Sequence, residues 1–330
     1  MKSNEKIVVP LTGGFGNQMF QVANALKVSK FNLEKIEFDL ELGRPKSIDS
    51  INPVSLPTLL GFRDTQTIIL KSSKVYSKLF GYCLRSGFKP NKLEKIKLFQ
   101  KCLEVFAFLL FWFRYRRVLK IFISKDLGWT KDIEFQDHGI FIGYFQSEAP
   151  LLEIQIRKFF QGKRYAESGK LKELIETAQL DKPTVIHVRR GDYNKENLLG
   201  ILGLDYYEKV VSTQKDIKES NVWIFSDDQS VAKELAELLR THISPRNTIK
   251  YFGQSELSNL ETFELMRYGT AYILANSSFG WWAANLSYYR KVKVFAPTPW
   301  FRFEKIPKKL IPKNWELFEA KWQDEREIEI

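Results

Sequence analysis

The second half of the chain alternates short apolar runs with amphipathic segments. The apolar runs predict buried strands at 184–188, 222–225, 248–252, 271–274 and 292–295. The segments between them have apolar residues at helical spacing and predict helices at 205–214, 229–240, 259–268 and 279–289. Strands that alternate with helices are typical of a parallel, doubly wound sheet, so this pattern indicates an α/β fold.

The first half begins with a predicted strand at 6–11, a glycine-rich loop at 12–17 and a helix. A helix that starts after such a loop presents free backbone N–H groups to an anion or a sugar. The loop is not a dinucleotide fingerprint, because Met19 stands where the third glycine belongs.

Size and composition indicate a globular protein with two domains. The chain has 330 residues, of which 44% are hydrophobic and 27% charged. A strand predicted at 139–145 is followed by the breaker Pro150, which suggests domains at 1–150 and 151–330. No apolar run reaches the roughly 18 residues of a membrane span. Two cysteines cannot form a disulfide framework, so we expect a cytoplasmic protein.

Positive charge is concentrated in residues 71–125, which hold 14 Lys and Arg and only two acids. This segment accounts for the whole net charge of +12, which argues against a general nucleic-acid-binding protein. Its pattern is mainly helical, and its apolar run at 105–113 is followed by Arg114, Arg116 and Arg117. Two interpretations stay open. The run contacts an anionic membrane surface peripherally, or it is a buried helix with a solvated basic flank.

Three polar clusters follow strands of the second half, at 187–193, 226–228 and 276–279. The carboxyl ends of parallel strands lie at one edge of a sheet, where ligands of such folds bind. Guanidinium groups in the first cluster suit a phosphate or pyrophosphate. Each cluster also has a structural explanation, as a salt bridge or as a helix cap. Because all three converge on one edge, we expect a shared ligand site.

The residue types in these clusters suit a nucleotide sugar. Side chains alternate along a strand, so Arg189 and Arg190 should point in opposite directions, and one can hold a pyrophosphate while the other holds neighbouring structure. Asp227 or Asp228 could accept hydrogen bonds from the amino group and ring N–H of guanine. The three histidines show no ligand spacing, so no metal site is expected.

Four motifs occur in the order expected for a known family. They lie at 13–21, 187–193, 225–228 and 276–282 and resemble those of the alpha-1,2-fucosyltransferases, glycosyltransferase family 11. The chain departs from the family pattern at two places. Gly280 stands where a serine is common, and Ala284-Asn285 replace a common Ala-Trp.

The resemblance implies a GT-B-type glycosyltransferase with two Rossmann-like domains that face each other across a cleft. It implies an inverting transfer, independent of metals and cofactors, from GDP-fucose bound to the C-terminal domain. The acceptor would be the 2-hydroxyl of a galactose-terminated oligosaccharide or glycolipid, and the product linkage α-1,2. A bacterial, cytoplasmic form without a membrane anchor is expected, with possible peripheral contact to the inner face of the membrane.

The resemblance also assigns roles by motif position. Arg189 would hold the β-phosphate, His187 would support the nucleotide end, and Asp227 or Asp228 would contact guanine or order its loop. The remaining donor-binding residues would line the phosphate and fucose: Asn276, Ser277, Ser278 and Phe279. The sugar or acceptor would be contacted by Gly14, Phe15, Gly16 and Asn17.

General-base help would come from Asp192 or, as a second candidate, Glu196. Asp192 could instead orient an arginine, and a route without a base stays open. Two alternatives to the main function remain: transfer of another sugar or to another hydroxyl, and a non-catalytic nucleotide-binding module.

Overall fold

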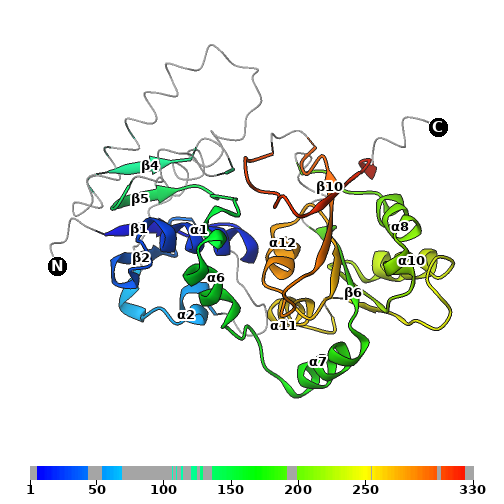
Figure 1. The fold of residues 1–330 in the computed structure, drawn as a ribbon. Helices are drawn as coiled ribbons and strands as arrows, with labels where there is room; N and C mark the ends of the chain where they lie inside the picture. The colour runs from blue at the N-terminus through cyan, green and yellow to red at the C-terminus, as the bar shows by residue number, and fades with distance from the viewer. Residues whose placement is uncertain are drawn as a thin grey trace, which may run out of the picture. The chain divides into compact units, whose positions relative to one another are not determined.

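The protein divides into two compact units, which are described separately. The computed structural model describes residues 6–43, 54–68, 106, 109, 113, 120–124, 127–128, 136–191, 199–253, 255–302 and 306–323. The first unit comprises Met1–Ile48, Val54–Phe160 and Ile306–Ile311. The second comprises Asp49–Pro53, Gln161–Lys305 and Pro312–Ile330. Figure 1 colours the chain by residue number.

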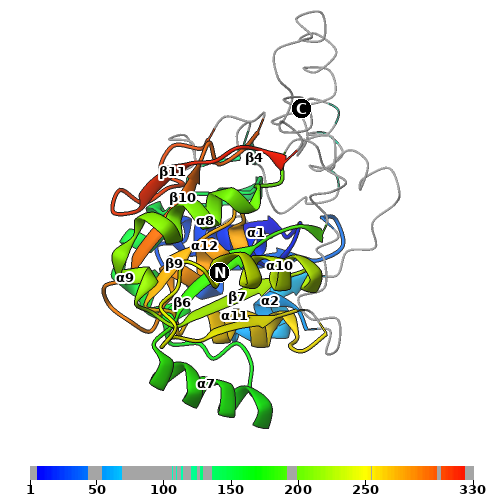
Figure 2. The same cartoon turned by 90° about the vertical axis from the view of Figure 1, so that its right-hand side faces the viewer.

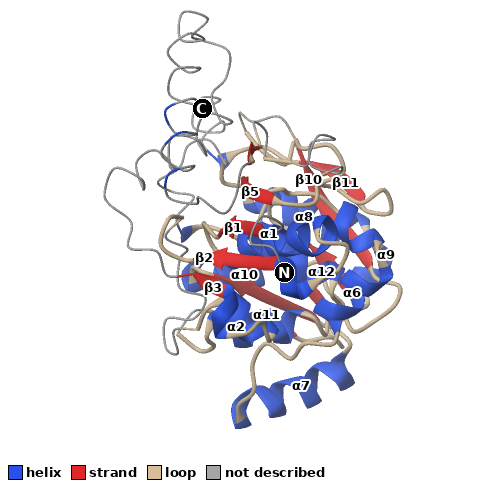
Figure 3. Cartoon of the chain, turned by 90° about the vertical axis from the view of Figure 1, so that its left-hand side faces the viewer, coloured by secondary structure: helices blue, strands red, loops and turns tan. Residues whose placement is uncertain are grey.

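The first unit is built on a parallel five-stranded sheet with the order β3-β2-β1-β5-β4 (Figure 3). Its strands are β1 (Ile7–Pro10), β2 (Ile36–Asp39), β3 (Thr67–Ile68), β4 (Ile121–Ile123) and β5 (Gly139–Ile142). Its α-helices with described bounds are α1 (Phe15–Val28), α2 (Leu56–Leu60) and α6 (Ile154–Gln161). Three short 3₁₀ segments accompany them: η1 (Leu33–Lys35), η2 (Asp64–Gln66) and η4 (Ala149–Leu152).

Helix α6 packs with the first unit, although the sequence suggested a boundary at 150. The ring of Phe159 lies 5.8 Å from that of Phe31 and 6.0 Å from that of Phe62. These edge-on aromatic contacts join α6 to segments near the start of the chain. The first unit therefore extends to Phe160, and the second begins at Gln161.

The second unit is built on a parallel six-stranded sheet with the order β11-β10-β9-β6-β7-β8. Its strands are β6 (Thr184–Val188), β7 (Val222–Ser226), β8 (Ile249–Phe252), β9 (Ala271–Ile273), β10 (Lys293–Thr298) and β11 (Glu316–Glu319). Counted from β8, this is the order third, second, first, fourth, fifth, sixth of doubly wound dinucleotide-binding sheets. The α/β fold with a parallel sheet is confirmed.

Helices cover both faces of this second sheet. They are α7 (Gly169–Asp181), α8 (Leu204–Thr213), α9 (Lys215–Lys218), α10 (Gln229–Leu239), α11 (Asn259–Met266) and α12 (Ser278–Asn285). Helices α8 and α10 lie on one face, and α11 and α12 lie on the other (Figures 1 and 2). Side chains cap α7, α10, α11 and α12 at their first turns, through Ser168, Asp228, Ser258 and Ser277.

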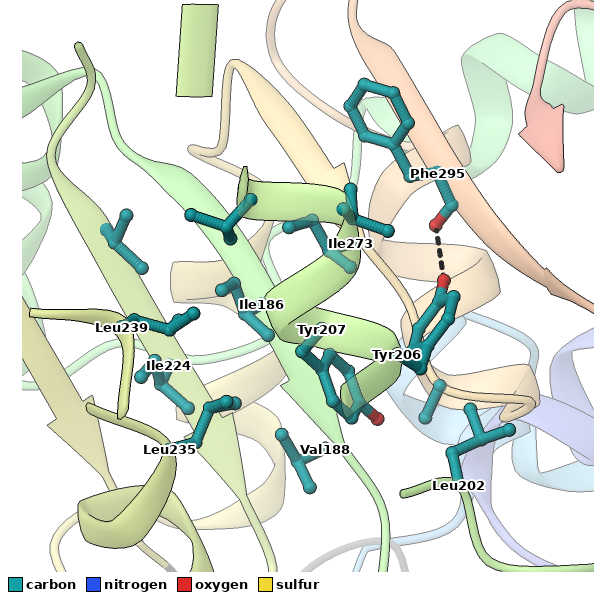
Figure 4. Packing of buried hydrophobic residues seen from close by; sticks show 14 of the residues in the cluster. Ile186, Val188, Leu202, Tyr206, Tyr207, Ile224, Leu235, Leu239, Ile273 and Phe295 are labelled. Carbon is teal, nitrogen blue, oxygen red and sulfur yellow. Dashed lines mark hydrogen bonds between the residues drawn. The ribbon is translucent and has the colours of Figure 1, made fainter. Parts of the chain in front are cut away.

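Alternation along β6 decides which side chains reach the core. Ile186 and Val188 pack with α8 and α10 in a cluster of fully buried apolar residues (Figure 4). The hydroxyl of Tyr206, in the same cluster, donates to the carbonyls of Leu274 and Phe295 at 3.2 and 3.4 Å. His187 lies on the opposite face, against α12, because neighbouring residues of a strand point to opposite sides.

Among the elements that differ from the sequence prediction, three show the physical reason. Strand β11 was not predicted, because most of its side chains are exposed and its sequence lacks an apolar run. Strand β4 lies in a segment that was predicted as mainly helical. Helix α12 was predicted to continue to 289 but ends at Asn285, where the Arg267 side chain donates to the Leu286 carbonyl at 3.0 Å.

Within the apolar run at 105–113, the structure describes Phe106, Leu109 and Phe113. They are helical, and their exposed fractions are 51%, 47% and 58%. The other residues of 105–119, with the arginines that follow the run, lie outside the described residues. No helix in the described part of the chain is long and apolar enough to cross a membrane. Contact with an anionic membrane surface stays a prediction.

Candidate functional site

The order in which the chain adds strands to the second sheet reverses between β6 and β9. The chain proceeds from β6 to β7 and β8 on one side and returns to β9, β10 and β11 on the other. In doubly wound sheets, ligands bind outside the carboxyl ends of the strands at this switch point. The N–H of Ala275 donates to the carbonyl of His187 at 2.9 Å, which joins the two strand ends. Two predicted clusters therefore flank the switch point, and the cluster after β7 lies beside the first.

The two arginines after β6 point to different surroundings. Arg190 is buried, and its Nη1 donates to the Leu202 carbonyl at 2.7 Å. The Arg189 side chain is 27% exposed, and its Nη1 lies 2.9 Å from Oδ2 of Asp227. The structure thus gives Arg190 an internal bond and leaves Arg189 at the strand end, as alternation along β6 predicts.

The acids after β7 both have contacts within the protein. Asp227 accepts the backbone N–H of Arg190 at 2.8 Å, and its side chain is only 6% exposed. Asp228 caps α10 by accepting the N–H groups of Ser230 and Val231 at 3.0 and 3.2 Å. The prediction left guanine contact or loop ordering open for these acids, and their contacts correspond to loop ordering and helix capping.

Asn276 fastens the far end of the loop that follows β6. Its Nδ2 donates to the carbonyls of Leu199 and Gly200 at 2.7 and 3.3 Å, and the residue is 2% exposed. Its amide N–H groups therefore hold this loop, and the predicted contact of Asn276 with the donor stays a prediction. Asp192 and Glu196, the two candidate bases, lie outside the described residues.

Helix α12 begins at the switch point, directly behind the loop after β9. The side chain of Ser277 accepts the N–H of Phe279 at 3.3 Å and caps the helix, while Ser278 is half-buried in its first turn. A helix N-terminus carries partial positive charge and unsatisfied N–H groups, which favour an anion. Arg189 follows β6 and this helix follows β9, the neighbouring strand, and both groups suit a phosphate.

His187 is a buried, neutral histidine under the helix end. Its ring centroid lies 5.8 Å from that of Phe279, and its Nδ1 has no hydrogen-bond partner in the structure. Burial, with a smaller contribution from the nearby Arg189 charge, lowers the pKa of His187 to about 3. A Cβ on Gly280 would lie 2.7 Å from this Nδ1, so glycine at 280 makes room for the imidazole.

The first sheet has a switch point of its own, between β1 and β5. The loop after β1 includes Gly13, whose φ of +75° favours glycine, and Gly14, where an added Cβ would meet no atom within 4 Å. Asn17, in the first turn of α1, accepts a hydrogen bond from Nε2 of Gln146 at 3.0 Å. Gln146 belongs to the loop after β5, so this amide pair spans the switch point.

Two further glutamines of α1 hold the same loops. Gln18 donates to the Gly13 carbonyl at 3.0 Å. Gln21 is fully buried, and its amide accepts the N–H of Thr12 at 3.0 Å and donates to the Gly143 carbonyl at 2.9 Å. The GGFGNQMFQ motif therefore supplies both the loop and the amides that fix it.

The loop after β5 has an unusual backbone. Gly143 has a φ of +159° and Phe145, which is fully buried, has a φ of +52°. A left-handed conformation at a buried aromatic residue costs energy and is maintained only where the surroundings enforce it. Such strain frequently marks a functional loop.

Sequence reasoning placed the site in this unit on residues 14–17 and missed Gln146. The relevant signal was a polar residue directly after a predicted apolar strand, the same signal used for the second unit. Residues 11–17 and 143–147 carry no formal charge, so the site suits a neutral ligand rich in hydroxyl groups. Among the described residues, no group of His, Cys, Asp and Glu is arranged to hold a metal ion.

Comparison with known proteins supports the motif resemblance. Residues 140–319 match the family described as "Glycosyl transferase family 11". An alpha-1,2-colitosyltransferase of Escherichia coli is 26% identical over 309 residues, 91% of this chain and 94% of its own length. The O-antigen biosynthesis glycosyltransferase WbnK of Escherichia coli is 32% identical over 123 residues, 36% of this chain and 39% of its own length.

The chain is also weakly similar to two solved structures. POFUT1 in complex with GDP has a TM-score of 0.41 and 13% identity, covering 88% of this chain and 97% of that chain. NodZ alpha-1,6-fucosyltransferase co-crystallized with GDP has a TM-score of 0.39 and 13% identity, covering 85% of this chain and 92% of that chain.

Proposed function

The chain belongs to glycosyl transferase family 11 and is a glycosyltransferase, and we propose that it transfers fucose from GDP-fucose to the 2-hydroxyl of a galactoside. The proposal includes inversion at the fucose C1, an α-1,2 product linkage, and the GT-B arrangement in which the two Rossmann-like units face each other across a cleft. Family membership favours an enzyme over a non-catalytic nucleotide-binding module.

The observation that carries this proposal is the chemistry at the switch point of the second sheet. Arg189 and the N-terminus of α12, with Ser277 and Ser278, are brought to the strand ends where doubly wound sheets bind nucleotides. Guanidinium and helix N–H groups both favour a diphosphate. The neutral imidazole of His187 below them fits the nucleotide side of the donor.

The mechanism follows from where charge develops. As the acceptor oxygen attacks the fucose C1, the bond to the diphosphate breaks and negative charge grows on the leaving group. Arg189 and the helix end would stabilise that charge, which is the contribution a divalent cation makes in other transferases. Proton removal from the acceptor hydroxyl would fall to Asp192, with Glu196 as the second candidate.

The neutral switch point of the first sheet would bind sugar. The amide of Asn17, fixed by Gln146, can hydrogen-bond hydroxyl groups, and the loop around Gly14 leaves open space beside it. We assign this region to the fucose or to the galactose-terminated oligosaccharide or glycolipid acceptor.

The proposal is tested by incubating the protein with GDP-fucose and lactose and locating the product linkage by NMR. An α-1,2-linked fucose is expected, formed at an unchanged rate with EDTA present, and 2-deoxygalactosides should give no product. Transfer to another hydroxyl would correct the linkage. Absence of transfer from GDP-fucose to any galactoside would contradict the proposal.

A second donor has specific support. The relative that spans 91% of the chain is an alpha-1,2-colitosyltransferase. Colitose differs from fucose in lacking the 3-hydroxyl, so the same diphosphate site could serve either sugar. The ratio of kcat/KM for GDP-fucose to kcat/KM for GDP-colitose, measured with both donors in competition, shows which sugar the enzyme prefers.

A further inference from the structure

The carboxylate of Asp227 is held between two groups of the loop after β6. Its Oδ1 accepts the backbone N–H of Arg190 at 2.8 Å, and its Oδ2 lies 2.9 Å from Nη1 of Arg189. The Asp227 side chain is 6% exposed, whereas that of Arg189 is 27% exposed. The acid is therefore buried against the loop, and the arginine beside it is partly exposed.

Gly191 leaves the space that this carboxylate occupies. A Cβ at 191 would lie 2.3 Å from Oδ2 of Asp227, well inside van der Waals contact. Gly191 is not among the residues with positive φ, so its backbone does not require glycine. The missing side chain serves the packing of the acid rather than the shape of the turn.

We propose that Asp227, in the space left by Gly191, is a positioning residue that aims the Arg189 guanidinium at the diphosphate, an inference that rests on the proposed function. A guanidinium is a planar fork with five N–H donors, so the charge of a carboxylate beside one Nη attracts the group to one place while it occupies only one edge of the fork.

The opposite role for Asp227 would be a gate, whose negative charge repels the diphosphate. The contacts favour positioning. The second oxygen of the carboxylate accepts a hydrogen bond from the backbone N–H of Arg190, and breaking this bond would oppose movement of the acid together with the Arg189 side chain. The two roles predict opposite signs for the removal of the charge.

The experiment is a double-mutant cycle on GDP affinity, measured by calorimetry on Asp227→Asn, Arg189→Ala and the combined variant. The asparagine retains an oxygen for the Arg190 N–H but turns an N–H donor toward the guanidinium. We expect Asp227→Asn to weaken GDP binding by about tenfold, typical of losing one charge-assisted contact. In the Arg189→Ala background, the same substitution should change the affinity less than about twofold, because its effect passes through Arg189.

Gly191→Ala supplies an independent variant that retains both charged residues in the sequence. The new methyl should displace the Asp227 carboxylate and weaken GDP binding to an extent similar to Asp227→Asn. The matched control is Glu234→Gln, which removes one negative charge from the exposed side of α10 and should leave the affinity unchanged. Thermal unfolding of each variant verifies that it is folded.

The outcomes separate this inference from the proposed function. Tighter GDP binding by Asp227→Asn, or equal effects of that substitution with and without Arg189, would overturn the positioning role. Absence of GDP binding by the wild-type protein would overturn it as well. A wild-type protein that binds GDP and shows the expected cycle but transfers no fucose would contradict only the proposed reaction.

Discussion

The two units present the same architectural feature with different chemistry. Each has a parallel sheet with a switch point beside its first strand, and each places a glycine-containing loop and a helix start there. In the second unit, the switch point holds a guanidinium, a buried imidazole and a helix end. In the first, it holds amides and a glycine loop without formal charge. The backbone sets where a ligand can bind, and the side chains set the chemistry, which favours an anion at one place and a neutral, hydrogen-bonding ligand at the other.

The largest effect is expected at the charged switch point. Arg189→Ala should lower kcat/KM with GDP-fucose by about 10²–10³, or roughly 3–4 kcal/mol of transition-state stabilisation, because the leaving diphosphate would lose a charged hydrogen-bond donor. Arg189→Lys should fall between the alanine variant and the wild type, because lysine keeps the charge but not the fork. Steady-state kinetics measure both. Unchanged turnover by a folded Arg189→Ala variant would contradict the assignment of the diphosphate to the charged switch point.

Substitutions at the neutral switch point should lower the free energy of unfolding. Gln21→Leu leaves the Thr12 N–H and the Gly143 carbonyl without their buried partner, at a cost of about 2–4 kcal/mol in the free energy of unfolding. Urea unfolding followed by circular dichroism measures this loss. Gln179→Leu, on the exposed side of α7, is the matched control and should change stability by less than about 0.5 kcal/mol. An equal stability of the two variants would show that the amides of α1 do not hold the loops.

A smaller effect should appear in the pH dependence of folding. The pKa of His187 is about 3 in the folded protein and near 6.5 when unfolded, so between these values the unfolded chain binds the extra proton. The free energy of unfolding therefore falls as pH drops below about 6.5, by at most about 1.4 kcal/mol per pH unit from this residue. Urea midpoints at pH 7.5 and pH 5 should show a larger acid loss for the wild type than for His187→Gln. Parallel losses in both proteins would mean that His187 is not the acid-sensitive group.

The sequence was sufficient to predict five of the six strands of the second sheet. These five strands are apolar runs, the predicted helices between them have amphipathic spacing, and the position of the polar clusters at strand ends follows from topology. The contacts of Asp227 and Asn276 were not predictable in this way. Both residues bond groups that are distant in the sequence, and whether such a side chain faces a ligand or its own loop depends on packing that periodicity does not encode.

The first unit was predicted less completely, for a related reason. Strand β4 and the inclusion of α6 depend on pairing and aromatic contacts between distant segments, as between Phe159 and Phe31. Gln146 directly follows a predicted apolar strand, but its partner Asn17 is distant in the sequence, so the pairing that gives Gln146 a role is visible only in the structure. Local patterns identify elements, whereas long-range contacts decide how these elements share a site.

The close approach of position 191 to the carboxylate of Asp227 has a consequence for sequence divergence. A side chain can enter position 191 only if position 227 becomes shorter or turns away. The two positions should therefore covary among relatives, with glycine at one accompanying aspartate at the other. Relatives that break this pairing would be expected to hold the diphosphate by a different set of contacts.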